Sequence, residues 1–282
     1  MNIIENKVYD EERSLYNLKN SQVINCTFAG EKDGESVLKE ARNIEVINCN
    51  FELRYPLWHV DGFLLKDSTL TDLSRAPLWY CKNGQINNVE IKSVKPLREC
   101  SDITVSNSNI DSIEFGWKCN NIKIDHCKIN SVYIFFDSNN VEISDLTFTG
   151  KYSFQYMHNL TITNSNLDTK DAFWHSKDVL IKDCIVKGEF LGWFSENLTF
   201  INCKIIGTQP LCYCKNLKLI NCQMIDTDLA FEYSEVEATI KGHVVSIKNP
   251  KSGKIIVDSV GEIINKDSIM ENNCQIIVGE KQ

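Results

Sequence analysis

Three ionisable residues recur at one spacing and are of the types that perform acid–base chemistry. Glu99, Lys118 and Asp137 are each separated from the next by 19 residues. A pair of carboxylates can cleave a glycosidic bond, and inverting glycosidases hold the two groups roughly 6.5–9.5 Å apart. Lys118, between them, can stabilise a carboxylate or an acidic group of a substrate. We therefore take these three as candidate catalytic residues, with a solvated face of mixed charge as the alternative.

Aromatic and basic residues accompany this set at the same spacing. All five Trp residues, and several His and Tyr residues, stand at two adjacent positions of the 19-residue repeat. Aromatic rings supply large, rigid contact surfaces on which sugar rings stack, and an arginine beside Glu99 can hold a sugar carboxylate in a forked hydrogen bond. The candidate substrate-binding residues are Arg98, Trp58, His59, Trp79, Tyr80, Trp117, Tyr156, Trp174 and His175.

The same spacing runs through most of the chain and identifies the elements that would position these residues. Segments 43–51, 197–205 and 216–224 all begin with Asn and share an Asn-Cys pair at the same place. From position 84 to position 236 the first apolar residues of successive units lie 19 residues apart, after intervals of 23, 19 and 21 residues. A fixed period this short indicates a solenoid of stacked coils.

The pattern inside each unit selects the kind of solenoid. Ile103 and Val105, like Ile122 and Ile124, alternate with polar residues, which indicates strands. Nineteen residues are too few for two helices or a propeller blade. We predict an all-β chain, a single-stranded right-handed parallel β-helix with coils of about 19 residues and a capping segment at each end. The predicted layout is one domain over 1–282, with an N-terminal cap at 1–20, stacked coils at 21–235, and C-terminal coils and cap at 236–282, including strands near 240–247, 254–260 and 276–278.

The Cys and Asn residues have an architectural interpretation. Ten of the 12 Cys fall into two columns of small residues that we expect inside the coil. The closest pair, Cys212 and Cys214, matches no zinc or redox motif, so we predict structural thiols, no metal site and no cofactor. Asn and Asp fill two other columns, where they suit tight turns and can bond from coil to coil.

The orientation of the Trp column has two interpretations. Simple alternation with the Cys and Ser column two residues later places the Trp side chains inside, as a core ladder. Lys39, Arg98 and Gln155 occupy the same column and are poor interior residues. A turn between the two columns would break the alternation and place the Trp side chains outside, as a platform for sugars.

A second candidate site lies near the start of the repeats, where the first coil is longer than the others. The acids Asp33, Glu35 and Glu40 can approach His59 and Arg54 there. The alternative is that this segment only caps the first coil.

The repeated units also resemble a known superfamily. The pattern Asn-Ile-x-Val-x-Asn-Cys-x-Phe is similar to that of the right-handed parallel β-helix proteins that include pectate lyases and polygalacturonases. Segments 33–40, 53–59 and 76–80 resemble more closely a bacterial family known only as a domain of unknown function. The resemblance covers almost the whole chain and implies the fold, but it implies no activity or catalytic residue. The chain lacks a recognisable calcium-carboxylate cluster of pectate lyases and the acidic pairs of polygalacturonases.

Composition narrows the class of partner. The net charge of −8 gives no general attraction to nucleic acid or to an anionic membrane surface. No apolar run is long enough to span a bilayer, and residues 1–7 lack a secretory signal, so we expect a cytoplasmic protein. The predicted function is to bind or cleave an extended oligo- or polysaccharide along the lateral face. The alternative is a non-catalytic scaffold or interaction protein whose aromatic column is core or a dimer interface, and the sequence leaves the oligomeric state open.

Overall fold

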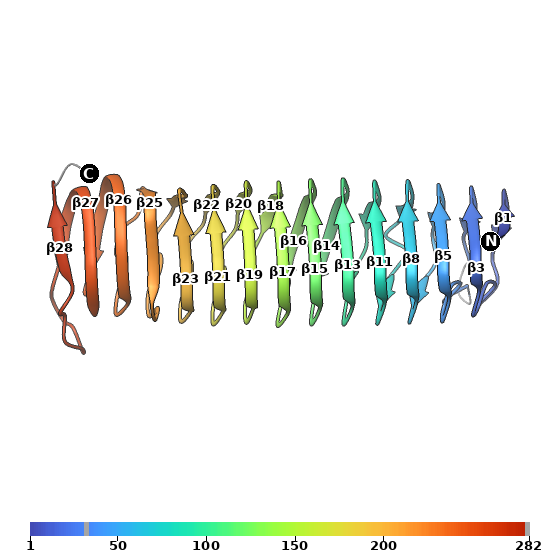
Figure 1. The fold of residues 1–282 in the computed structure, drawn as a ribbon, viewed down its shortest axis with the longest axis horizontal. Coiled ribbons are helices and arrows are strands. Elements are labelled where there is room, and N and C mark those ends of the chain that lie inside the picture. The colour runs from blue at the N-terminus through green and yellow to red at the C-terminus, as the bar shows by residue number, and fades with distance from the viewer. Residues whose placement is uncertain (31–33, 280–282) are drawn as a thin grey trace. The chain divides into compact units, whose positions relative to one another are not determined.

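The computed structural model describes residues 1–30 and 34–279. The chain forms two compact units, Met1–Glu142 (unit 1) and Ile143–Gln282 (unit 2). In each unit the strands of one coil pair in parallel with the same strands of the next coil, as Figure 1 shows, which confirms the predicted all-β parallel solenoid. The described residues include no helix that is long and apolar enough to cross a membrane.

Unit 1 repeats a six-residue strand once per coil. Gly84 pairs with Phe63 on one side and with Ile103 on the other, which is the register that the spacing of the first apolar residues predicts. A shorter second strand follows in each coil, and a third pair forms where two coils carry Leu-Trp. The first set is β3 (Lys19–Ile24), β5 (Arg42–Ile47), β8 (Asp61–Lys66), β11 (Lys82–Asn87), β13 (Ser101–Ser106) and β15 (Asn120–Asp125). The others are β1 (Asn2–Glu5), β2 (Val8–Tyr9), β4 (Thr27–Phe28), β6 (Asn50–Phe51), β7 (Leu57–Trp58), β9 (Thr69–Leu70), β10 (Leu78–Trp79), β12 (Glu90–Lys92), β14 (Asn109–Phe115) and β16 (Lys128–Ile134).

Unit 2 continues the same pattern and ends in longer strands. The division between the units falls within β17 (Asn139–Ser144). The strands predicted near 240–247, 254–260 and 276–278 are confirmed, since they lie within the last three strands of the chain. The strands of unit 2 are β18 (Thr147–Gly150), β19 (His158–Thr163), β20 (Asn166–Asp168), β21 (Lys177–Lys182), β22 (Ile185–Lys187), β23 (Glu196–Ile201), β24 (Lys204–Ile206), β25 (Leu217–Ile225), β26 (Glu235–Lys248), β27 (Ser252–Ile264) and β28 (Gln275–Val278).

The interior of the coils is filled by the alternating apolar residues and the small columns. Phe63 is buried in β8, and its ring occupies the space beside Gly84, where an added Cβ would come within 2.2 Å of the ring. All 12 Cys lie in the described part of the chain and carry free thiols. The ten that were expected inside the coil are buried, as predicted, and so is Cys212, whereas Cys274 is partly exposed. Burial raises the pKa of Cys49 and of Cys214 to about 11.

The coils turn at residues with left-handed backbone conformation. Both Asn columns have this conformation, as at Asn43 and Asn48, each with φ of 52°. Asn tolerates it better than other residues with a Cβ atom. In unit 1, Asn48 Nδ2 donates to Asn25 Oδ1 at 2.7 Å, and in unit 2, Asn202 Nδ2 donates to Asp183 Oδ1 at 3.0 Å. These exposed amides therefore link neighbouring coils within each unit.

Candidate functional site

A third left-handed corner decides where the Trp side chains point. Lys118, with φ of 53°, stands between Trp117 and the buried Cys119. The left-handed residue interrupts the strand alternation, so Cys119 lies inside while Trp117 is only partly covered. All five Trp side chains are partly exposed. The turn between the two columns is therefore confirmed, and a sugar platform on the Trp side chains stays a prediction.

The rings of the Trp column in unit 1 cover one another. Trp58 and Trp79 stack at a centroid distance of 5.4 Å and an interplanar angle of 4°. The Arg98 guanidinium lies 5.1 Å from the Trp79 ring and 5.5 Å from the Trp117 ring, in the range of cation–π contacts. The ring faces are thus used within the ladder, and the partly exposed parts of these side chains are available at their edges.

The indole N–H groups of the column are used as well. In unit 1, Trp58 Nε1 donates to the Ala76 carbonyl at 2.9 Å, and Trp79 Nε1 donates to the Lys95 carbonyl at 2.8 Å. Each acceptor belongs to the corner of the next coil. Since unpaired backbone carbonyls are costly when covered, these bonds fasten one coil to the next.

Unit 2 shows the same bond made by a different side chain. Trp193 Nε1 donates to the Gln209 carbonyl at 2.8 Å, and Gln155 Nε2 donates to the Asp171 carbonyl at 2.8 Å. In both cases the acceptor follows the donor by 16 residues. Gln155 thus makes the same coil-to-coil hydrogen bond as Trp193, which explains how it can stand in a row of Trp.

Arg98 is surrounded by carboxylates as well as indoles. Its Nη1 lies 3.8 Å from Glu114 Oε2, and its Nε lies 3.9 Å from Glu99 Oε1. Lys95 Nζ lies 3.5 Å from Glu114 Oε1. The Glu114 side chain is only 17% exposed, so these contacts are partly shielded from solvent. In unit 1, Arg98 is held by protein groups, and its contact with a substrate carboxylate stays a prediction.

The residues at the left-handed corner of successive coils form a row that we call the corner strip, defined as His59, Tyr80, Glu99, Lys118 and Asp137. All have positive φ, and all are exposed except Tyr80, which is half-buried. The Glu99 N–H donates to the Trp117 carbonyl at 2.9 Å, and the Lys118 N–H donates to the Phe136 carbonyl at 2.9 Å, so the strip advances one coil at each residue. Strands in a sheet are about 4.8 Å apart, which places the Glu99 and Asp137 backbones about 9.6 Å apart.

The aromatic members of the strip stack on each other. The rings of His59 and Tyr80 lie 4.8 Å apart at an interplanar angle of 14°. Trp79 meets the Tyr80 ring edge-on, at 6.0 Å and 87°. The structure thus brings the predicted residues of unit 1 into two adjoining ladders, with the polar part of the corner strip following the aromatic part.

Three of the predicted binding residues belong to unit 2. Tyr156 and His175 stack at 5.1 Å, and Trp174 stacks on Trp193 at 5.5 Å. His175 also stacks on Phe194, which the prediction did not include. The predicted set is therefore distributed over both units, and only its unit 1 members accompany the acids Glu99 and Asp137.

Two further predicted groups behave as local pairs. Glu35 Oε2 lies 3.2 Å from Arg54 Nη2, and Glu40 Oε2 lies 3.4 Å from Arg42 Nη2. Asp33, the third acid of the second candidate site, lies outside the described residues.

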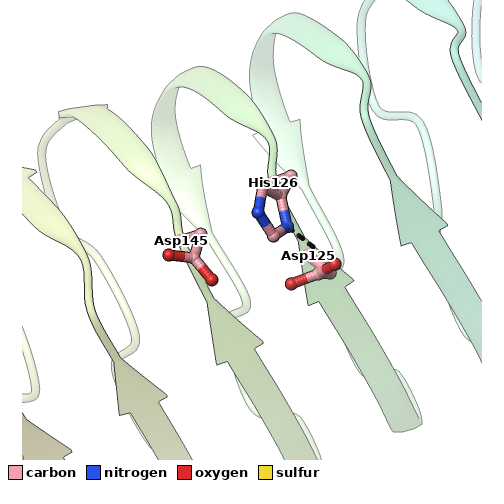
Figure 2. A group of neighbouring side chains, drawn as sticks. All are labelled: Asp125, His126 and Asp145. Carbon is pink, nitrogen blue, oxygen red and sulfur yellow. Dashed lines mark hydrogen bonds and ion pairs between the residues drawn. The ribbon is translucent and has the colours of Figure 1, made fainter.

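His126 occupies an Asn position of a corner column in unit 1, and its Nδ1 lies 2.8 Å from Asp125 Oδ2, as Figure 2 shows.

Sequence reasoning missed a hollow on the lateral surface of unit 1, which we call the axial groove. It consists of two adjoining depressions of about 580 Å³ and 290 Å³, both lined by Asp72. Its exposed apolar residues gave no signal because they stand singly in the sequence. Among its lining residues are Glu52, Arg54, Leu73, Arg75, Lys92, Ser93, Asp111, Ile113, Asn130 and Val132.

Several solved structures are similar to this chain in fold. A tailspike protein mutant of E. coli bacteriophage HK620, in complex with a hexasaccharide, is 12% identical with a TM-score of 0.48, over 92% of this chain and 60% of that chain. The surface adhesin PfbA of Streptococcus pneumoniae is 11% identical with a TM-score of 0.41, over 82% of this chain and 72% of that one. An exopolygalacturonase of Thermotoga maritima is 10% identical with a TM-score of 0.36, over 98% and 84%.

The comparison of sequences gives a family but no characterised relative. No curated protein matches the chain. The family described as "Protein of unknown function (DUF3737)" matches residues 2–277, which is nearly the whole sequence and includes every residue of the corner strip. The chain therefore belongs to this family of parallel β-solenoid proteins, whose function is unknown.

Proposed function

We propose that unit 1 binds an extended saccharide along its lateral surface and cleaves it with residues of the corner strip. The observation that carries this proposal is the left-handed corner, which presents one side chain per coil in a straight row. A polymer that runs along the stack meets a new side chain about every 4.8 Å. Such a row fits a repeating chain better than it fits a compact ligand.

The chemistry of the row supports a sugar chain. His59 and Tyr80 offer ring edges and polar ring atoms, and Glu99, Lys118 and Asp137 offer charged hydrogen-bonding groups. Because the neighbouring Trp faces are covered by stacking, contact with sugars would use ring edges and polar groups. Binding of this kind is directional, which favours a ligand rich in hydroxyl groups.

Cleavage is assigned to the two acids of the strip. The backbones of Glu99 and Asp137 are about 9.6 Å apart by the strand spacing, and side-chain movement can bring the carboxyls into the 6.5–9.5 Å range of inverting enzymes. One carboxyl would protonate the leaving oxygen, and the other would activate a water molecule on the opposite side of the sugar ring. Lys118, on the coil between them, would stabilise a carboxylate or an acidic substrate group.

The experiment is a turnover and binding screen with neutral and uronic-acid oligosaccharides. We expect Glu99→Gln and Asp137→Asn each to reduce turnover by at least about 100-fold, the usual contribution of a general acid or base. Glu90→Gln, an exposed acid of β12, is the matched control and should leave turnover unchanged. Binding that persists without turnover would leave a binding role and remove the catalytic one, and no binding at the strip would remove both.

A scaffold role is the second candidate, and a specific observation favours it. The faces and N–H groups of the Trp column are used to fasten coils together, as at Trp58 and Trp79. On this view the column is part of the fold, and the corner strip is the outer surface of a structural ladder. We also propose, from composition, a cytoplasmic protein that binds neither nucleic acid nor membranes.

A further inference from the structure

We propose that the axial groove of unit 1 is a separate binding site for a neutral, extended saccharide. The site goes beyond the corner strip, since the two share no residue and each can fail alone. Its two depressions adjoin at Asp72, which lines both. Lys92 of β12, Asp111 of β14 and Asn130 of β16 are paired positions that line the second depression, so its wall repeats along the stack at the coil spacing.

Exposed apolar side chains line both depressions. Leu73 lines the first and is 59% exposed, and Ile113 and Val132 line the second and are 51% and 38% exposed. A ligand with apolar faces gains free energy by covering these side chains. Large exposed aliphatic side chains that gather in a hollow are more informative than those scattered over a surface.

A polar row lines the second depression together with Ile113 and Val132. Asn130 Nδ2 donates to Asp111 Oδ1 at 3.0 Å, which orients both side chains on neighbouring coils. Ser93 lies at the floor, and Lys92 stands at the position that pairs with Asp111. Apolar side chains beside a row of donors and acceptors match the two kinds of surface of a sugar chain, its C–H faces and its hydroxyl groups.

The balance of charge argues for a neutral chain. Three acids, Glu52, Asp72 and Asp111, line the groove together with three bases, Arg54, Arg75 and Lys92. The groove therefore has no excess of positive charge to compensate a polyanion such as a polyuronate. Arg54 is in addition paired with Glu35 at 3.2 Å.

The backbone argues against an extended peptide. Peptides commonly bind β-proteins by adding a strand to an open sheet edge. In this part of unit 1 the strand edges are occupied by neighbouring coils, because β14 pairs with β12 on one side and with β16 on the other. The Ser93 N–H, at the floor, donates to the Asp111 carbonyl at 3.1 Å. A ligand in the groove meets side chains, which suits a saccharide.

The test is calorimetric titration of the full chain with neutral hexasaccharides of β-1,4-glucan and β-1,4-xylan, and with hexagalacturonate as the anionic probe. We expect a neutral hexasaccharide to bind and Ile113→Glu to weaken binding by about tenfold or more. The matched control is Ile185→Glu in unit 2, where the native side chain is 39% exposed and outside the groove. That control should bind as the wild type does.

Three results would overturn the proposal. One is binding that is lost in Tyr80→Ala but unchanged in Ile113→Glu, which would leave only the corner strip. Another is binding of hexagalacturonate in preference to the neutral chains, with loss in Ile113→Glu. The third is binding of unstructured peptides that is lost in Ile113→Glu, with no binding of any hexasaccharide. Loss in Ile113→Glu with normal binding in Tyr80→Ala would support the groove and contradict the corner strip.

Discussion

At the scale of single residues, the left-handed corner determines how the residues of the corner strip are presented to solvent. A residue with a Cβ atom loses roughly 1–2 kcal/mol when it adopts this conformation. Glu99, Lys118 and Asp137 nevertheless adopt it, with φ of 51–53°. The neighbouring coils hold these residues in place through backbone hydrogen bonds, such as that from the Glu99 N–H to the Trp117 carbonyl. The residue types at this position are therefore explained by the side chain presented to solvent more than by an intrinsic preference for positive φ.

The indole hydrogen bond gives a prediction at the same scale. Trp79→Phe keeps a ring in the stack and removes the N–H donor to the Lys95 carbonyl. We expect the free energy of unfolding to fall by about 1 kcal/mol or more, because that carbonyl loses its partner. Tyr80→Phe, in the adjoining ladder, is the control and should change it by less than about 0.5 kcal/mol. Equal effects in denaturant titrations would show that the N–H contributes nothing.

At the scale of elements, the side chains of two neighbouring strands complement each other in size at one interior position. Phe63 in β8 occupies the space beside Gly84 in β11, and the Ile103 side chain lies on the other side. At this position a large ring in one coil is therefore accommodated by a residue without a side chain in the next. This pairing also explains why an otherwise apolar column contains a glycine.

Enlarging Gly84 tests that matching. In Gly84→Val the Cβ would lie 2.2 Å from the Phe63 ring, so the ring must move. We expect a loss of about 1–3 kcal/mol in the free energy of unfolding, as for other overpacked cores. The double variant Gly84→Val with Phe63→Val should recover part of that loss, because the two sites are in contact. Additive losses in the double variant would contradict the account.

The buried thiols give a prediction at the scale of the whole molecule. Burial raises the pKa of Cys49 and Cys214 to about 11, above the ordinary value of 9.0, because the thiolate is poorly solvated inside the coils. The folded chain then holds protons that the unfolded chain releases above pH 9. Stability is fully present below that pH and should fall as the pH rises through 9 to 11.

Alkylation and pH-dependent unfolding check this prediction. At pH 8, iodoacetamide should modify the native chain slowly and mainly at Cys274, the one Cys that is partly exposed. The unfolded chain should take up reagent at all 12 Cys. Unfolding free energies measured from pH 8 to 11 should decline, and Cys49→Ser should reduce the slope of that decline. Rapid native alkylation of several Cys would contradict the buried columns.

The strands and corners could be predicted from the sequence where the residue type itself favours the observed backbone conformation. Alternating Ile and Val identified the strands, and Asn43 and Asn48 marked corners because Asn tolerates positive φ. The corner at Glu99 and Tyr80 was not identifiable in this way, since neither residue type favours that conformation. The axial groove was missed because Ser112 and Ser131 lie inward while the apolar Ile113 and Val132 lie outward, the reverse of the usual pattern.

The shared register of successive coils has one consequence for how such a chain can change in evolution. Ser101 pairs with Asn120, so a deletion of residues 101–119 would join Cys100 to Asn120 in register and shorten unit 1 by one coil. Lys118 would be lost, and Asp137 would stand on the coil next to Glu99. Their backbones would then be about 4.8 Å apart, and their carboxyl groups could adopt the roughly 5–5.5 Å separation of the carboxyls in retaining glycosidases. Gain or loss of one coil thus changes the distance between surface groups by about one strand spacing without altering the fold.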